Sequence, residues 1–156
     1  MLLSRVTRFL VSKLSKADPE LSPRYDAPPT MDIDVEKRYT ALVHLSCGDI
    51  AIELLPRIAP LAVNNFVFLA NDGFYDGTSF HRVVPGFLAQ AGDPIGNGRG
   101  GPGYRILDEL SDEPFRRGTV GMANAGPNTS GSQFYILLAD APQLYGRYSA
   151  FGRVTT

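Results

Sequence analysis

The sequence predicts a mainly β fold, an antiparallel barrel or sandwich, and two observations lead to this expectation. Short segments with strand-like patterns follow one another closely after residue 73, and Gly- and Pro-rich loops separate them. Only one segment after residue 38, at 60–73, has the apolar spacing of a helix. Closely spaced strands with few helices are typical of antiparallel folds rather than of strands that alternate with helices. With 156 residues, the chain has the length of one compact domain.

The first 38 residues are expected to lie outside this domain, in two parts. Residues 1–17 are interpreted as a basic amphipathic extension, expected to be helical, because apolar residues recur at helical spacing and acidic residues are absent. A role of this extension in organellar transit or at a membrane surface stays open. Residues 18–38 are rich in proline and are expected to form a linker or an arm. The domain itself is therefore expected over residues 39–156.

This domain is expected to begin with a hairpin and a helix. Apolar and polar residues alternate over 39–45 and again over 50–54, and the residues between them suit a turn. Pro60 suits the first position of a helix and Gly73 suits its left-handed stop. The later strands are expected at 78–84, 87–91, 119–122, 133–138 and 149–154.

Composition and charge exclude several classes of protein. The formal net charge is −1, so the chain lacks the basic field that non-specific binding of nucleic acid requires. Its single cysteine, Cys47, cannot form an internal disulfide and favours a reducing, cytoplasmic location. Two histidines without paired cysteines give no metal-site pattern, so no metal is expected. Unbroken apolar runs, such as 66–70, are far shorter than the roughly 20 residues of a membrane-spanning helix.

Two sequence patterns suggest nucleotide binding or a serine nucleophile, but the residues around them do not fit either function. Residues 96–101 read Gly-Asn-Gly-Arg-Gly-Gly, which matches the glycine spacing of a dinucleotide-binding loop. Prolines flank this run where a strand and a helix are required, so a flexible loop is expected instead. Ser130 and Ser132 lie near glycines, with His81 elsewhere, but neither serine has the strand-to-helix setting of a nucleophile elbow.

Four segments instead resemble the signature motifs of the cyclophilins, a family of peptidyl-prolyl cis/trans isomerases. They are Phe-His-Arg-Val-Val-Pro-Gly-Phe at 80–87, Gln-Ala-Gly-Asp at 90–93, Met-Ala-Asn-Ala-Gly-Pro-Asn-Thr-Ser-Gly-Ser-Gln-Phe at 122–134, and Phe-Gly-Arg-Val at 151–154. The resemblance implies an eight-stranded antiparallel barrel with capping helices and an active groove on its outer face. Cyclophilins continue past the last motif, so this domain is expected to lack the family's C-terminal helix and closing strand.

The resemblance also implies roles for individual residues. The catalytic positions fall on Arg82 and Gln90. Those that would bind the substrate are Phe87, Leu88, Ala123, Asn124, Gln133, Tyr135, Leu144 and Tyr148. Gln143 stands where cyclosporin-sensitive members have tryptophan, which argues against tight cyclosporin binding.

These residue types suit rotation about an Xaa-Pro bond. The amide barrier of roughly 18 to 20 kcal/mol arises from resonance that vanishes when the bond is twisted, so no covalent bond has to form. A catalyst has to hold the proline ring and favour the twisted state, and Arg82 could donate to atoms that the twist exposes. The expected partners are Xaa-Pro segments of client polypeptides, and no cofactor is needed. The alternative interpretation is a cyclophilin-like module that binds proline peptides with weak catalysis.

Overall fold

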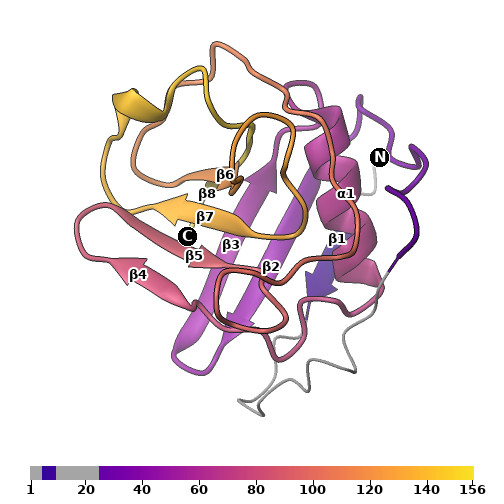
Figure 1. The fold of residues 1–156 in the computed structure, drawn as a ribbon, viewed down its shortest axis with the longest axis horizontal. Coiled ribbons are helices and arrows are strands. Elements are labelled where there is room, and N and C mark those ends of the chain that lie inside the picture. Colours follow the sequence, from indigo (N-terminus) through magenta and orange to yellow (C-terminus); the bar gives the residue numbers. More distant parts are fainter. Residues whose placement is uncertain (1–4, 10–24) are drawn as a thin grey trace.

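A computed structural model of the chain describes residues 5–9, as backbone, and residues 25–156. One eight-stranded sheet dominates it, with the strand order β1-β2-β3-β8-β6-β7-β5-β4 (Figure 1). The strands are β1 (Arg5–Phe9), β2 (Tyr39–Leu45), β3 (Gly48–Leu54), β4 (Arg82–Val84), β5 (Leu88–Ala91), β6 (Thr119–Met122), β7 (Phe134–Leu137) and β8 (Ala150–Val154). The helices are α1 (Pro60–Asn71) and the short 3₁₀ helix η1 (Pro142–Leu144). The expected mainly β fold is confirmed.

The sheet is curled and open. All pairings from β2 to β4 are antiparallel, whereas β1 runs parallel to β2. Within the described residues β1 and β4 form the two edges and do not pair with each other. The expected barrel is therefore a half-barrel, and in the described part of the chain a single α-helix packs on it where several capping helices were expected.

The expectation of a helix over residues 1–17 is wrong for Arg5–Phe9. These residues form β1, which pairs with β2 from Arg5 opposite Tyr39 to Phe9 opposite Val43. The segment contains β-branched Val6 and Thr7 and aromatic Phe9, residue types that favour strands. An edge strand offers unpaired N–H and C=O groups, so pairing there competes with an isolated helix. The rest of the extension and residues 18–24 lie outside the described residues.

The other elements follow the expected order, and several of the later strands are shorter than expected. The hairpin β2–β3 and the helix α1 lie where they were expected, and Gly73 has the left-handed φ of 75° just after the helix. The strand expected over 78–84 shrinks to β4, because Thr78, Ser79 and Phe80 make no sheet pairing. None of the helices in the described part of the chain is both long and apolar enough to cross a lipid bilayer.

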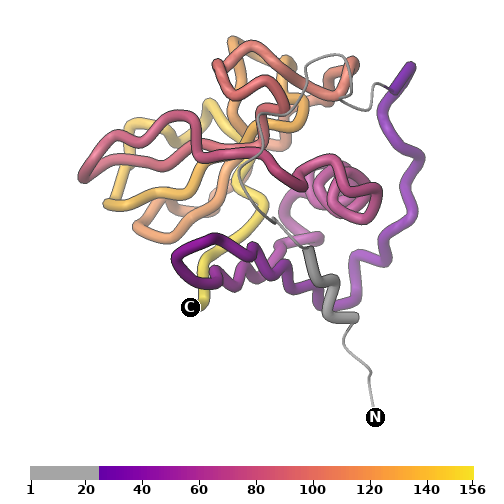
Figure 2. Tube along the Cα trace, turned by 90° about the horizontal axis from the view of Figure 1, so that it is seen from below, coloured from indigo at the N-terminus to yellow at the C-terminus, as the bar shows by residue number. Residues whose placement is uncertain are grey.

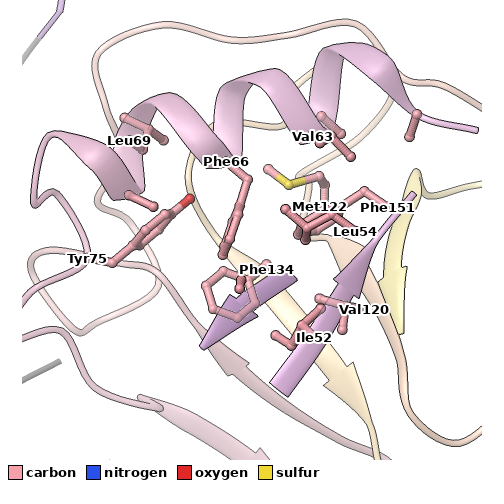
Figure 3. Packing of buried hydrophobic residues seen from close by; sticks show 14 of the residues in the cluster. Ile52, Leu54, Val63, Phe66, Leu69, Tyr75, Val120, Met122, Phe134 and Phe151 are labelled. Atoms are coloured by element: carbon pink, nitrogen blue, oxygen red, sulfur yellow. The ribbon is translucent and has the colours of Figure 1, made fainter. Parts of the chain in front are cut away.

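Helix α1 packs over the inner face of the sheet and builds the main core. Its buried side chains, among them Val63, Phe66 and Leu69, meet strand residues such as Ile52 and Phe134 (Figure 3). The rings of Phe66 and Phe134 meet edge to face at 5.5 Å between centroids, an arrangement that aromatic pairs favour. This packing fixes the strands that carry the site on their other face.

The segment 25–38 lies against the outer side of α1, so that the helix is held between this segment and the sheet (Figures 1 and 2). Buried Asn64 of α1 accepts hydrogen bonds from the backbone N–H of Asp32, at 2.9 Å, and of Ile33. Tyr25 stacks edge to face on Phe68 at 5.1 Å. The described part of the expected linker or arm is thus an arm that packs on the domain.

Strand alternation divides the sheet into two faces. Along β7, Phe134 and Ile136 belong to the main core under α1, whereas Tyr135 and Leu137 point to a second, smaller cluster. Because side chains of a strand alternate between faces, this second cluster marks the outer face. The candidate site lies there.

Candidate active site

The strand register lines up four positions across the outer face. Arg82 pairs with Gln90, Gln90 with Tyr135, and Tyr135 with Gly121, so that one row crosses β4, β5, β7 and β6. Neighbours in such a row lie close enough for their side chains to interact. The register therefore brings a cation, an amide and an aromatic ring together from four separate stretches of sequence.

An apolar cluster lies beside this row, and we call it the outer-face cluster. Its buried members include Leu88, Phe115, Tyr135, Leu137 and Ala150. Partly buried side chains pack on it and form its surface; these are Phe87, Ala123, Leu144 and Tyr148. All six apolar residues that the sequence assigns to substrate binding thus meet in one cluster.

Tyr135 forms the floor of the outer-face cluster. Its side chain is only 3% exposed, and its ring meets that of Tyr148 edge to face at 5.7 Å. Burial, with a smaller contribution from Tyr148, raises the pKa of its phenol far above the ordinary value, so the hydroxyl stays neutral. The hydroxyl has no hydrogen-bond partner among the described residues. It lies over Gly121, where a Cβ atom would come within 2.5 Å of the Tyr135 Oη. Glycine at 121 thus makes room for the phenol.

A chain of hydrogen bonds orients Arg82. The Gln133 amide donates from Nε2 to the carbonyl of Gly100 at 2.8 Å, which fixes its Oε1 as an acceptor. Gln90 donates from Nε2 to that Oε1 at 2.9 Å, so its own Oε1 is free to accept from Arg82 Nη1 at 3.3 Å. The backbone carbonyl at one end therefore sets the direction of every bond in the chain. Arg82 remains exposed, with its guanidinium available to a ligand.

The loop that supplies the Gly100 carbonyl is built around buried Asp93. This carboxylate, whose residue is 1% exposed, accepts backbone N–H groups of Ile95 at 2.8 Å, Asn97 at 2.9 Å and Gly98. Burial acts to raise the pKa of Asp93, but these N–H groups outweigh it and hold the pKa below the ordinary value. The glycine-rich run 96–101 is the loop that was expected, and its N–H groups bind a carboxylate of the same chain.

The segment 130–133 is fixed from the core side. Buried Asn65 of α1 donates to the Gly131 carbonyl at 2.7 Å and accepts from the Tyr104 hydroxyl at 2.6 Å. Tyr75 donates to the Ser132 carbonyl at 3.0 Å, and Ser132 donates from Oγ to the Gly92 carbonyl at 2.7 Å. Ser132 is thus a structural residue, which agrees with the expectation that it is no nucleophile.

A hollow of about 860 Å³ adjoins the outer-face cluster, and we call it the side hollow. Residues of the loop 94–105 and of the segment 123–133 line it. It shares Gln90, Ala123, Asn124 and Gln133 with the candidate site, whereas Phe87, Leu144 and Tyr148 lie outside it. The site therefore has two parts: an apolar surface and a polar hollow that meet along these shared residues.

The structure brings all ten residues of the expected site to this one face. Arg82, Gln90 and Gln133 form the hydrogen-bonded chain, and Asn124 lines the hollow and donates from Nδ2 to the Arg147 carbonyl at 3.1 Å. Sequence reasoning gave no role to Gly121 or Asp93. Gly121 carries no motif signal of its own, whereas an acidic residue just before a glycine-rich loop could have been read as the anchor of that loop.

Comparison with known proteins agrees with this fold. A family model for the cyclophilin type peptidyl-prolyl cis-trans isomerases matches residues 40–156. A peptidyl-prolyl cis-trans isomerase of Helicobacter pylori is 46% identical over 125 residues, which cover 79% of this chain and 77% of the relative. Peptidyl-prolyl cis-trans isomerase B of Bacillus subtilis is 50% identical over 109 residues, covering 69% of this chain and 76% of the relative.

A solved structure of a cyclophilin type peptidyl-prolyl cis-trans isomerase from Cryptosporidium parvum, in the presence of the dipeptide Ala-Pro, is also similar. It superposes with a TM-score of 0.69 at 41% identity, over 71% of this chain and 75% of that chain. Fold and similarity together define an isomerase built on a curled β sheet. The chain belongs to the cyclophilin type peptidyl-prolyl cis-trans isomerase family, and its enzymatic activity is peptidyl-prolyl cis-trans isomerisation.

Proposed function

We propose that this enzyme assists protein folding by accelerating rotation about Xaa-Pro bonds of client polypeptides, through a non-covalent mechanism centred on Arg82. The observation that carries the proposal is the placement of Arg82 at the end of a directed hydrogen-bond chain, on the same sheet face as the outer-face cluster. The proline ring would rest on the partly buried surface of that cluster, formed by Phe87, Leu144 and Tyr148. The relative that was solved in the presence of Ala-Pro supports a proline-containing ligand.

Arg82 would act on the twisted amide. When the bond rotates, the prolyl nitrogen regains a lone pair that resonance had withdrawn, and the carbonyl oxygen swings out of the peptide plane. A guanidinium that donates to either atom binds the twisted state more strongly than both planar states, which is the condition for catalysis. Gln90 holds the guanidinium in place by accepting one N–H, and the remaining donors of Arg82 can face the ligand.

The flanking peptide would be held by polar groups at the edge of the apolar surface. Asn124 and Gln90 are half-buried and line the hollow next to Ala123, so their amides and the local backbone are placed to bond an extended chain. Fixing the flanks restricts the reacting bond to orientations near the twisted one, which lowers the entropic part of the barrier. No bond is made or broken in this mechanism.

Substitution of Arg82 tests the proposal. A hydrogen bond from a charged group contributes about 1.5 to 3 kcal/mol, so Arg82→Ala should lower kcat/KM for a short Xaa-Pro peptide by roughly 10- to 100-fold. The measurement is isomer exchange in the peptide by NMR, with circular dichroism to establish that the variant is folded. Arg38→Ala is the matched control, because Arg38 is an exposed arginine next to β2.

Three outcomes separate the possible roles of the site. Full turnover in a folded Arg82→Ala variant would show that Arg82 takes no part in the mechanism. Binding of the peptide by the full chain without any rate enhancement would instead favour the proline-peptide-binding module. Arg82→Lys should recover only part of the rate, since lysine keeps the charge but lacks the planar fork of donors.

Two further properties stay proposals. Gln143 is exposed in η1, where it offers an amide instead of an indole ring, and we expect weak cyclosporin binding for that reason. A cytoplasmic location is supported by the exposed free thiol of Cys47, which suits a reducing compartment.

A further inference from the structure

The side hollow carries positive charge that the proposed mechanism does not use. Two arginines line it, Arg99 from the glycine-rich loop and Arg105 from the segment that follows. Both are exposed, and neither guanidinium forms an ion pair with any residue in the described part of the chain. No aspartate or glutamate in the described part of the chain lines the hollow. Its two cations are thus available to a ligand.

The acidic residue that is nearest to Arg99 in sequence, Asp93, already has hydrogen-bond partners. Asp93 precedes the loop, but its carboxylate is buried and points at the N–H groups of Ile95, Asn97 and Gly98. This arrangement holds Arg99 on a loop of fixed shape while leaving its guanidinium unpaired. The hollow is therefore an electropositive site on a preorganised backbone, the condition under which a charged group binds with the least ordering cost.

The hollow is also continuous with the place where substrate would bind. Gln90, Ala123, Asn124 and Gln133 belong to both. An extended peptide advances about 3.3 to 3.6 Å per residue, so residues that directly flank an Xaa-Pro bond on the outer-face cluster reach this shared wall first. One flank of the peptide then passes into the hollow.

We propose that Arg99 and Arg105, which line the side hollow, make the enzyme prefer substrates with an acidic side chain among the residues that flank the Xaa-Pro bond. The inference rests on the proposed function, since it assigns a substrate class to that same site. A guanidinium pairs with a carboxylate through two parallel hydrogen bonds, whereas a lysine at the same place meets two like charges. The other polar residues of the shared wall are neutral amides and do not discriminate by charge.

Peptides that differ only in one flanking charge test this preference. Two series of short Xaa-Pro peptides carry Glu, Gln or Lys, one series at the second residue before proline and the other at the residue after it. We expect kcat/KM in one of the two series to fall in the order Glu, Gln, Lys, with a Glu to Gln ratio of roughly three- to tenfold. The ratio should shrink as salt is added, because exposed charges are screened.

Variants assign the preference to the two arginines. In Arg99→Gln/Arg105→Gln the Glu to Gln ratio should fall to about one, whereas Arg99→Lys/Arg105→Lys should keep most of it because the charges remain. Arg38→Gln/Arg57→Gln removes the same two charges near β2 and β3 and should keep the full ratio.

The results separate this inference from the function on which it rests. Equal rates for Glu, Gln and Lys peptides in both series would overturn the inference and leave the isomerase in place. A preference that survives in the glutamine double variant, or that is lost in a folded lysine double variant, would also overturn it. Absence of turnover with every peptide would contradict the proposed function instead.

Discussion

At the scale of single residues, the site depends on the close contact between Tyr135 and Gly121, which no sequence motif predicts. Tyr135 and Gly121 are opposite each other on neighbouring strands, and the phenol lies where a larger residue at 121 would have its side chain. The sequence predicts Tyr135 as a pocket residue because the motif around it is recognisable. It could not predict Gly121, because the pairing that brings the two residues together depends on strand register.

The pair gives a prediction for both stability and activity. Tyr135→Phe removes a buried hydroxyl without a described partner, so it should leave the free energy of unfolding unchanged or raise it by up to about 1 kcal/mol. Gly121→Ala should lower that free energy by about 1 to 3 kcal/mol, since the new methyl group overpacks the site, and should lower turnover by displacing the ring. Urea unfolding and the peptide assay measure the two effects.

The double variant supplies the control for this pair. Gly121→Ala combined with Tyr135→Phe should recover only part of both losses, because the contact of the added Cβ with Oη is gone, whereas its contact with the ring Cζ, also at 2.5 Å, remains. Strictly additive effects would show that the two positions do not interact. A clear loss of stability in Tyr135→Phe alone would reveal a partner of the hydroxyl.

At the scale of elements, the loop 94–105 controls the orientation of Arg82. Its Gly100 carbonyl anchors Gln133, and through Gln133 and Gln90 the anchor extends to Arg82. The sequence predicts a flexible loop here from its glycines. What it could not predict is that a single buried carboxylate gathers the loop's N–H groups, because that depends on how the loop folds back on Asp93.

Neutralising Asp93 tests this arrangement. The pKa of Asp93 is lowered in the folded protein, so the stability that its charge provides is present above its unfolded value of about 3.9 and is lost as pH falls through the lower folded value. Asp93→Asn should therefore lower the free energy of unfolding near neutral pH, by about 1 to 3 kcal/mol. In acid the difference between the two proteins should disappear.

Urea unfolding as a function of pH measures this difference, and the peptide assay should show reduced turnover in the same variant. Asp26→Asn, on the exposed part of the arm, is the matched control and should leave both quantities unchanged. A stability difference that persists at the acid end would mean that the asparagine disturbs packing and not the charge.

At the scale of the whole molecule, the site and the N-terminal strand occupy opposite ends of one sheet. Among the described strands, β1 pairs only with β2, whereas β4 and β5, with Arg82 and Gln90, lie at the other edge. Alternation and turn residues predict most strands and the helix, since these signals are local. They do not predict β1, whose formation depends on an edge that only the folded sheet offers.

Removal of residues 1–9 tests whether the site works independently of β1. Loss of β1 exposes the backbone groups of β2, and an exposed edge pairs readily with another chain, so the shortened protein should self-associate more strongly in sedimentation velocity. Turnover per monomer should stay as it is, because the change lies far from β4 and β5 in the strand order. Reduced turnover of the monomeric fraction would show that β1 supports the site.

The position of β8 in the sheet also has a consequence for synthesis of the chain. Ile52 of β3 pairs with Val154 of β8, a partner about a hundred residues further along the sequence, and β8 also joins β3 to β6. During translation the hairpin β2–β3 can form early, but one side of β3 has no partner until β8 has left the ribosome. Contacts between such distant residues make folding slow, so in the nascent chain one edge of β3 stays unpaired, and the sheet stays incomplete, until β8 is available.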